Sequence, residues 1–147
     1  MDIDPSNVVV QLCARGIEAE MAGRAEEALS LYVQAWDKRT DGYEACIAAH
    51  YVARLQKDLE DVLHWNQESL LAADSVVDGR VAAFYPSLYL NMGKAHEDLG
   101  HRDEAQRFYR LAANGLAALP QGQHTDIVRQ GITAGLARVA GGSMSSY

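Results

Sequence analysis

Apolar residues recur at three- and four-residue steps along most of the chain, which is the period of one face of an α-helix. The pattern is clearest between Pro86 and Ala117, where two such faces follow each other. The residues on these faces are Tyr89, Met92, Gly93 and His96, and then Ala105, Phe108, Tyr109, Ala112 and Leu116. Gly100 can end the first helix in the left-handed conformation, and Asp103 and Glu104 place negative charge at the start of the second. The stretch therefore predicts a helical hairpin.

The first half of the chain shows the same arrangement. Helices are expected over about 6–22 and 24–38, with Gly23 as the break between them. We expect Asp4 to cap the first helix, with Pro5 at its first position. Asp41 and Glu44 have the spacing of a capping box and open a third helix, and a fourth follows the turn after residue 57.

Residues 73–85 interrupt this regular spacing. The segment contains Val76, Val77, Val81 and Phe84 and is too apolar for a plain solvated loop. Either the fourth helix runs on, or the fifth starts near Arg80 and accepts Pro86 in its early turns with a kink. We favour an extended helix pair with a turn at Asp78 and Gly79.

A last helix is predicted over about 125–140, with a single apolar stripe, as is typical of a helix that covers the end of a helical array. Gly131 and Gly135 lower its helix propensity and indicate a close backbone approach to the preceding hairpin. Residues 141–147 are expected to form a disordered tail.

The small and aromatic residues fall into slots that resemble the tetratricopeptide repeat. In the first pair these slots hold Leu12, Gly16, Ala19, Gly23, Ala28, Tyr32 and Ala35, and in the last pair they hold Met92, Gly93, His96, Gly100, Ala105, Tyr109 and Ala112. A period of 34 residues places repeats at about 9–42, 43–76 and 86–119. The middle repeat departs from the pattern, with His50 where glycine is usual and Asn66 in the aromatic slot.

The resemblance implies a single all-α domain over residues 1–140, a right-handed superhelix of antiparallel helix pairs with about seven helices. It also implies that the first helices of the repeats line a concave groove, which binds a protein or peptide segment. The residues selected for this partner-binding groove are Cys13, Ile17, Glu20, Ile47, Tyr51, Arg54, Ser87, Leu90, Asn91, Lys94 and Glu97. Tyr51, Arg54, Lys94 and Glu97 are its expected polar anchors.

One branch of the family grips acidic chaperone tails through a clamp of lysine, asparagine and arginine. The corresponding slots here hold Cys13, Ile17, Ala48, Ser87 and Asn91. All the basic members of the clamp are missing, so that function is not expected.

Charge and composition argue against several kinds of partner and site. The formal net charge of −7 argues against a nucleic-acid partner, because phosphate binding needs a basic patch. Cys13 and Cys46 form no CxxC motif, so neither a disulfide framework nor a metal site is indicated. We expect no signal peptide, and the sequence contains no apolar stretch long enough for a membrane span. We expect a cytoplasmic protein without a membrane partner.

Catalytic chemistry is not indicated either. The sequence contains no GxSxG, P-loop or HExxH motif, and its five histidines are scattered. His50 and His96 occupy interior slots, where a packed histidine is the expected interpretation. Trp36 and Trp65 could mark an interface, but on second helices they are expected to pack between repeats. We therefore expect a protein that is not an enzyme and needs no cofactor.

The leading hypothesis is a non-catalytic module, such as a scaffold, that binds a protein or peptide segment in the groove. Two alternatives stay open. The chain could be a peptide- or ligand-sensing regulatory subunit, or it could self-associate as a structural homodimer through the apolar insertion or the outer side of the last helix.

Overall fold

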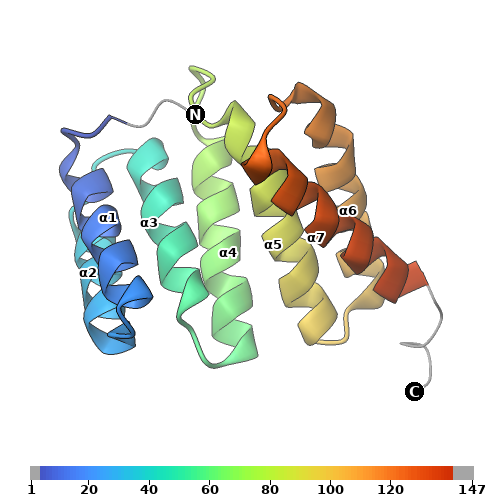
Figure 1. Ribbon diagram of the computed structural model, residues 1–147, viewed down its shortest axis with the longest axis horizontal. Coiled ribbons are helices and arrows are strands. Elements are labelled where there is room, and N and C mark those ends of the chain that lie inside the picture. Colours follow the sequence, from blue (N-terminus) through green and yellow to red (C-terminus); the bar gives the residue numbers. More distant parts are fainter. Residues whose placement is uncertain (1–3, 141–147) are drawn as a thin grey trace. The chain divides into compact units, whose positions relative to one another are not determined.

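The computed structural model describes residues 4–140, and within that range all regular structure is helical (Figure 1). Seven α-helices and two short 3₁₀ turns are present in this part of the chain. The predicted all-α fold with about seven helices is therefore confirmed. The tail predicted for residues 141–147 lies outside the described residues.

Contacts within the chain divide it into two compact units, Met1–Val81 and Ala82–Tyr147. In the first unit α1 (Val8–Met21) pairs with α2 (Ala25–Asp37), and α3 (Gly42–Arg54) pairs with α4 (Leu59–Asp74). The short connections make each pair an antiparallel hairpin. Because α3 also packs against α1 and α2, the two hairpins share one core.

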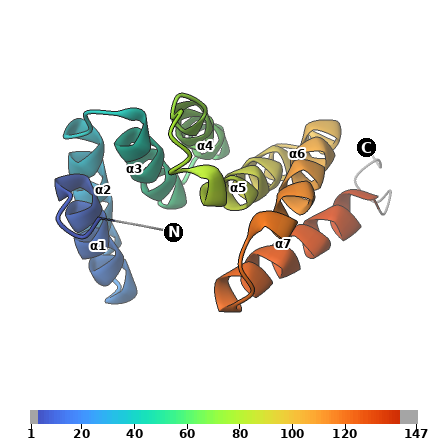
Figure 2. The same ribbon diagram turned by 90° about the horizontal axis from the view of Figure 1, so that it is seen from above.

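The second unit contains one hairpin and a covering helix. After the 3₁₀ turn η1 (Ala82–Phe84), α5 (Tyr85–Asp98) pairs with α6 (Arg102–Gly115). A second 3₁₀ turn, η2 (Leu116–Ala118), leads to α7 (Gln123–Ala140), which packs on both α5 and α6 (Figure 2). The helix predicted over about 125–140 is thus present and begins two residues earlier.

Glycine ends α1 and α5 as the sequence predicts. Gly23 has φ +82° and Gly100 has φ +82°, a left-handed conformation that side chains rarely adopt. The chain reverses direction directly after each of these glycines, so the two glycines mark the turns of the first and last hairpins.

The start of α1 differs from the prediction. Asp4 does not cap the helix, because its carboxylate instead accepts hydrogen bonds from the Ser6 backbone and hydroxyl. Asn7 is the N-cap, and its Oδ1 accepts from the backbone N–H groups of Val9 and Val10 at 2.8 and 3.1 Å. The predicted capping role of Asp4 was therefore wrong by three residues.

The segment between α4 and α5 is a turn that leads into η1. α4 ends at Asp74, so its expected extension was wrong. The start of the helical segment before Pro86 lies close to the predicted start near Arg80, because η1 begins at Ala82 and continues directly into α5. The turn at Asp78 and Gly79 is confirmed, since Asp78 Oδ1 accepts from the backbone N–H of Arg80 at 3.1 Å. Pro86 lies in the first turn of α5, where its missing N–H leaves no helical hydrogen bond unmade.

Candidate functional site

The groove residues predicted for the first unit lie on α1 and α3, which contact each other. Cys13 and Ile47 are buried, Ile17, Glu20 and Tyr51 are partly exposed, and Arg54 is exposed. The structure therefore places all six on neighbouring helices. Two of them, however, belong to the core, which leaves four with accessible surface.

Glu20 is the centre of a polar network in this unit. Tyr32 from α2 donates its hydroxyl to Glu20 Oε1 at 2.8 Å, and Arg54 from α3 donates from Nη2 to Oε2 at 2.8 Å. The hydrogen bond from Arg54, joined by that from Tyr32, holds the pKa of Glu20 below its ordinary value. Glu20 and Arg54, predicted as groove residues, thus neutralise each other.

The Tyr32 ring is enclosed by close packing. A Cβ added at Gly16 would lie 2.3 Å from Tyr32 Cε1, so only glycine fits at that position of α1. The ring also stacks on Tyr51 with centroids 5.2 Å apart. Burial, together with the Glu20 carboxylate, raises the pKa of Tyr32 and keeps its hydroxyl a hydrogen-bond donor.

The second unit repeats this network around Glu97. Tyr109 donates to Glu97 Oε1 at 2.6 Å, and Arg138 donates from Nε to Oε2 at 2.6 Å and from Nη2 to Oε1 at 3.0 Å. Burial raises the pKa of Glu97, but the hydrogen bonds from Arg138 and Tyr109 outweigh it and hold that pKa below its ordinary value. The Glu97 side chain is only 12% exposed, against 24% for Glu20.

Tyr109 lies between two glycines. A Cβ at Gly93 of α5 would lie 2.7 Å from the ring, and a Cβ at Gly135 of α7 would lie 2.4 Å from it. The close approach predicted for Gly135 is therefore confirmed. Gly131 also approaches α5, since a Cβ there would lie 3.0 Å from Leu90 Cδ2.

Sequence reasoning missed the role of Arg138. In the first unit the arginine stands 34 residues after the glutamate, but 34 residues after Glu97 the sequence has Gly131. Arg138 is two helical turns further along α7. The longer connection between α6 and α7 shifts the register, and no signal in the 34-residue period reveals this.

The middle pair has no such network. Asn66 occupies the position of Tyr32 and donates to the Val62 carbonyl at 3.0 Å, within its own helix. His50 occupies the position of Gly16 and lies edge-to-face with Tyr51, with ring centroids 4.9 Å apart. Burial, assisted by the charge of Arg54, lowers the pKa of His50 to about 4, so this imidazole is neutral at pH 7.

The remaining groove residues lie on α5. Leu90 packs against the cores formed by α6 and α7. Ser87 and Asn91 are partly exposed, and Lys94 is exposed and paired with Asp98. Because α7 covers Leu90, the second unit offers less open apolar surface on its first helix than the first unit does.

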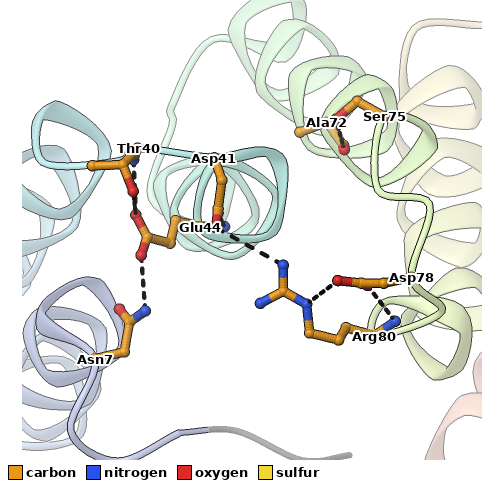
Figure 3. A network of polar contacts seen from close by, with 8 residues as sticks. All are labelled: Asn7, Thr40, Asp41, Glu44, Ala72, Ser75, Asp78 and Arg80. Atoms are coloured by element: carbon orange, nitrogen blue, oxygen red, sulfur yellow. Dashed lines mark hydrogen bonds and ion pairs between the residues drawn. The ribbon is translucent and has the colours of Figure 1, made fainter.

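A second polar network gathers at the start of α3 (Figure 3). Asp41 caps the helix by accepting from the Glu44 backbone N–H at 2.8 Å. The Glu44 carboxylate accepts from the Thr40 backbone N–H and from Asn7 Nδ2, both at 2.8 Å. The predicted spacing of Asp41 and Glu44 is thus used, with Thr40 as the donor to Glu44. Asn7 joins the start of α1 to α3.

Arg80 holds the segment after α4 against the same end of α3 (Figure 3). Its Nε lies 2.9 Å from Asp78 Oδ2 and its Nη2 lies 3.9 Å from Asp41 Oδ2. Its guanidinium carbon lies 4.5 Å from the centroid of the Tyr43 ring. No pattern along the chain indicates this contact, because Arg80 and Asp41 are brought together only by the tertiary fold.

The two cysteines and the pair formed by buried His96 and exposed His101 show no sign of activation. Burial raises the pKa of the Cys13 thiol to about 12 and also raises that of Cys46, so both remain protonated. His96 Nδ1 lies 2.9 Å from His101 Nδ1, and the His96 ring stacks on Phe108. Burial first, and then the neighbouring His101, lower the pKa of His96.

Residues 4–140 contain no group of three or more histidine, cysteine or acidic side chains arranged to hold a metal ion. None of their helices combines the length and apolar character that crossing a bilayer requires. Comparison with protein-family models, curated proteins and solved structures gave no match.

Proposed function

We propose that the chain is a helical-repeat protein of the tetratricopeptide type and acts as a non-catalytic module that binds a protein or peptide segment. The recurrence of glycine, glutamate and tyrosine supports the repeat assignment. Gly16, Glu20 and Tyr32 return as Gly93, Glu97 and Tyr109, each 77 residues later and with the same hydrogen bond between tyrosine and glutamate. A duplicated helical hairpin accounts for this recurrence.

The observation that carries the binding proposal is an apolar row left open on the first unit. Val10 and Ile17 of α1 are partly exposed, and Met21 is 84% exposed. These three lie seven and four residues apart and so share one side of the helix. Tyr51 of the neighbouring α3 and Leu55, the residue that caps the end of α3, are also partly exposed. We name these five residues the α1–α3 face.

The Glu20–Arg54 ion pair provides polar groups beside this face. The Arg54 side chain is 51% exposed, and only its Nη2 is engaged with Glu20, so other guanidinium N–H groups point to solvent. An apolar row beside a half-exposed ion pair suits a peptide held by side-chain pockets and oriented by a few hydrogen bonds. Arg54 then serves the fold and the partner together.

A displayed library of random twelve-residue peptides provides the test. Peptides selected on the wild-type protein should bind Met21→Glu at least roughly tenfold more weakly, because a charge replaces apolar contact area. Leu71→Glu, which changes a 64%-exposed leucine of α4, is the matched control and should bind like wild type. Both variants should keep the wild-type Tm.

Two results would refute the assignment. The selection could enrich no peptide, or the selected peptides could bind the Met21 and Leu71 variants equally well. Either outcome would remove the α1–α3 face as the binding surface.

A further inference from the structure

A second surface of the first unit lies on α2 and α4, outside the α1–α3 face. Trp36 of α2 and Trp65 of α4, the two tryptophans of the chain, meet edge-to-face with ring centroids 5.1 Å apart. This contact agrees with the expected packing between helix pairs. Both side chains nevertheless remain partly exposed, and Val33, one turn before Trp36, is 39% exposed. The pair is therefore a surface feature as well as a packing contact.

An arginine of the chain itself already stacks on one of these two tryptophans. The guanidinium carbon of Arg39 lies 3.7 Å from the centroid of a Trp36 ring. Indole is the aromatic group that attracts cations most strongly, and arginine stacks on it more often than lysine does. Arg39 occupies Trp36. Trp65 meets both Trp36 and His64 edge-to-face, and the part of its ring that stays exposed is the open position of the pair.

Trp65 is flanked by carboxylates that lack a cation partner. Asp61 stands one turn before it and Glu68 one turn after it on the same side of α4. Neither forms an ion pair with any residue between 4 and 140, whereas Glu20, Glu97 and Glu104 all do. The α4 segment Leu59–Asp74 contains no lysine or arginine that could compensate them.

The charge of the first unit is consistent with a basic partner. Residues 1–81 contain fifteen acidic and seven basic residues, so the net negative charge of the chain lies there. Residues 82–147 contain five acidic and six basic residues. A cationic segment would therefore be attracted to the first unit and not to the second.

We propose that Trp36, Trp65, Asp61 and Glu68 form a docking surface for an arginine-rich segment of a protein partner. One guanidinium of the partner stacks on Trp65 while Asp61 or Glu68 accepts its N–H groups. This surface is separate from the α1–α3 face, so the two sites can be tested independently.

Tryptophan fluorescence gives a direct readout, because both tryptophans lie in the proposed surface. The probe is an eight-residue peptide of alternating arginine and glycine, compared with peptides that have lysine or glutamate in place of arginine. The arginine peptide should change the fluorescence saturably and bind more tightly than the lysine peptide. The glutamate peptide should produce no change.

The variant Asp61→Asn/Glu68→Gln should weaken the arginine peptide by roughly tenfold, since two exposed charge contacts are lost. Glu18→Gln/Glu26→Gln removes the same charge from α1 and α2 and is the matched control; its affinity should stay within about twofold of wild type. Circular dichroism should show equal Tm values for both double variants, because all four side chains are at the surface.

Several results would overturn the proposal. These are the absence of a saturable fluorescence change, equal weakening in both double variants, or equal affinity for the arginine and lysine peptides. A fluorescence change that depends only on protein concentration would also overturn it, because it would identify a second copy of this chain as the occupant.

Discussion

Both compact units pack a buried tyrosine in a similar way, but different residues surround it in each unit. Each buries a tyrosine from a second helix against a glycine of the first and holds its hydroxyl on a glutamate. In the first unit Tyr51 stacks on the other side of Tyr32, and Arg54 reaches Glu20 through one nitrogen. In the second unit Gly135, and not an aromatic ring, packs against Tyr109. Arg138 binds Glu97 through two nitrogens.

The difference shows how a covering helix alters a repeated unit. α7 brings its backbone against Tyr109 and its arginine against a glutamate that is half as exposed as Glu20. It also covers Leu90 on the first helix of its unit. The second unit therefore gains a tighter network and loses open apolar surface. The first unit keeps the α1–α3 face, which is why we assign binding to it.

The largest expected effect concerns the glycine that distinguishes the second unit. Gly135→Ala places a Cβ 2.4 Å from Tyr109 and should lower the free energy of unfolding of that unit by roughly 1–3 kcal/mol. Gly131→Ala, one turn away on α7, meets only the movable end of Leu90 and should be neutral or slightly stabilising. Hydrogen exchange of peptides from residues 85–140 measures both variants. Equal effects of the two substitutions would contradict the packing comparison.

The next prediction concerns the pH dependence of the stability of the first unit. The pKa of His50 is lowered to about 4, while an unfolded histidine titrates near 6.5, so the unfolded state binds more protons between these values. Stability of the first unit should therefore fall as the pH decreases from about 6.5 to 4. The full pKa difference corresponds to about 3 kcal/mol, and the partial exposure of His50 to water reduces the expected fall to on the order of 1–2 kcal/mol. His50→Gln should remove this part of the decrease.

Urea unfolding followed by tryptophan fluorescence reports the first unit alone, since both tryptophans are in it. His64→Gln, on the exposed side of α4, is the control for loss of an imidazole and should follow the wild-type profile. If the His50 and His64 variants gave the same pH profile, the neutral state of His50 in the folded protein would be disproved.

The smallest effect compares the two ion pairs. Arg138→Gln should destabilise the second unit by about 1 kcal/mol and Arg54→Gln the first by about half as much, since both arginines are half exposed and water screens the pairs. Both glutamates have a lowered pKa, so each contribution is present above about pH 4.5 and lost as the pH falls through the lowered value. Urea titrations at pH 7 and pH 3 measure it; a larger effect of Arg54 would reverse the comparison.

Much of this fold could be predicted because its signals are local. The breaks at Gly23 and Gly100, the turn at Asp78, and the small slots at Gly16 and Gly93 are all visible in the apolar period and the turn residues. One of the predictions that failed concerns competition between neighbouring caps. Asp4 and Asn7 are both good N-cap residues, and only the contact of Asn7 with Glu44 on another helix favours the later start.

The sequence by itself determined the helix pairs, the inward-facing glycines and the acidic character of the first unit, because each depends on the order of residues along the chain. The tertiary structure alone decided which charges far apart in the chain meet. Arg54 and Arg138 reach equivalent glutamates from 34 and 41 residues away, and Arg80 folds back on Tyr43. Such pairings depend on how far each connection shifts the next helix along its axis, and that shift follows from packing around the buried rings of Tyr32 and Tyr109.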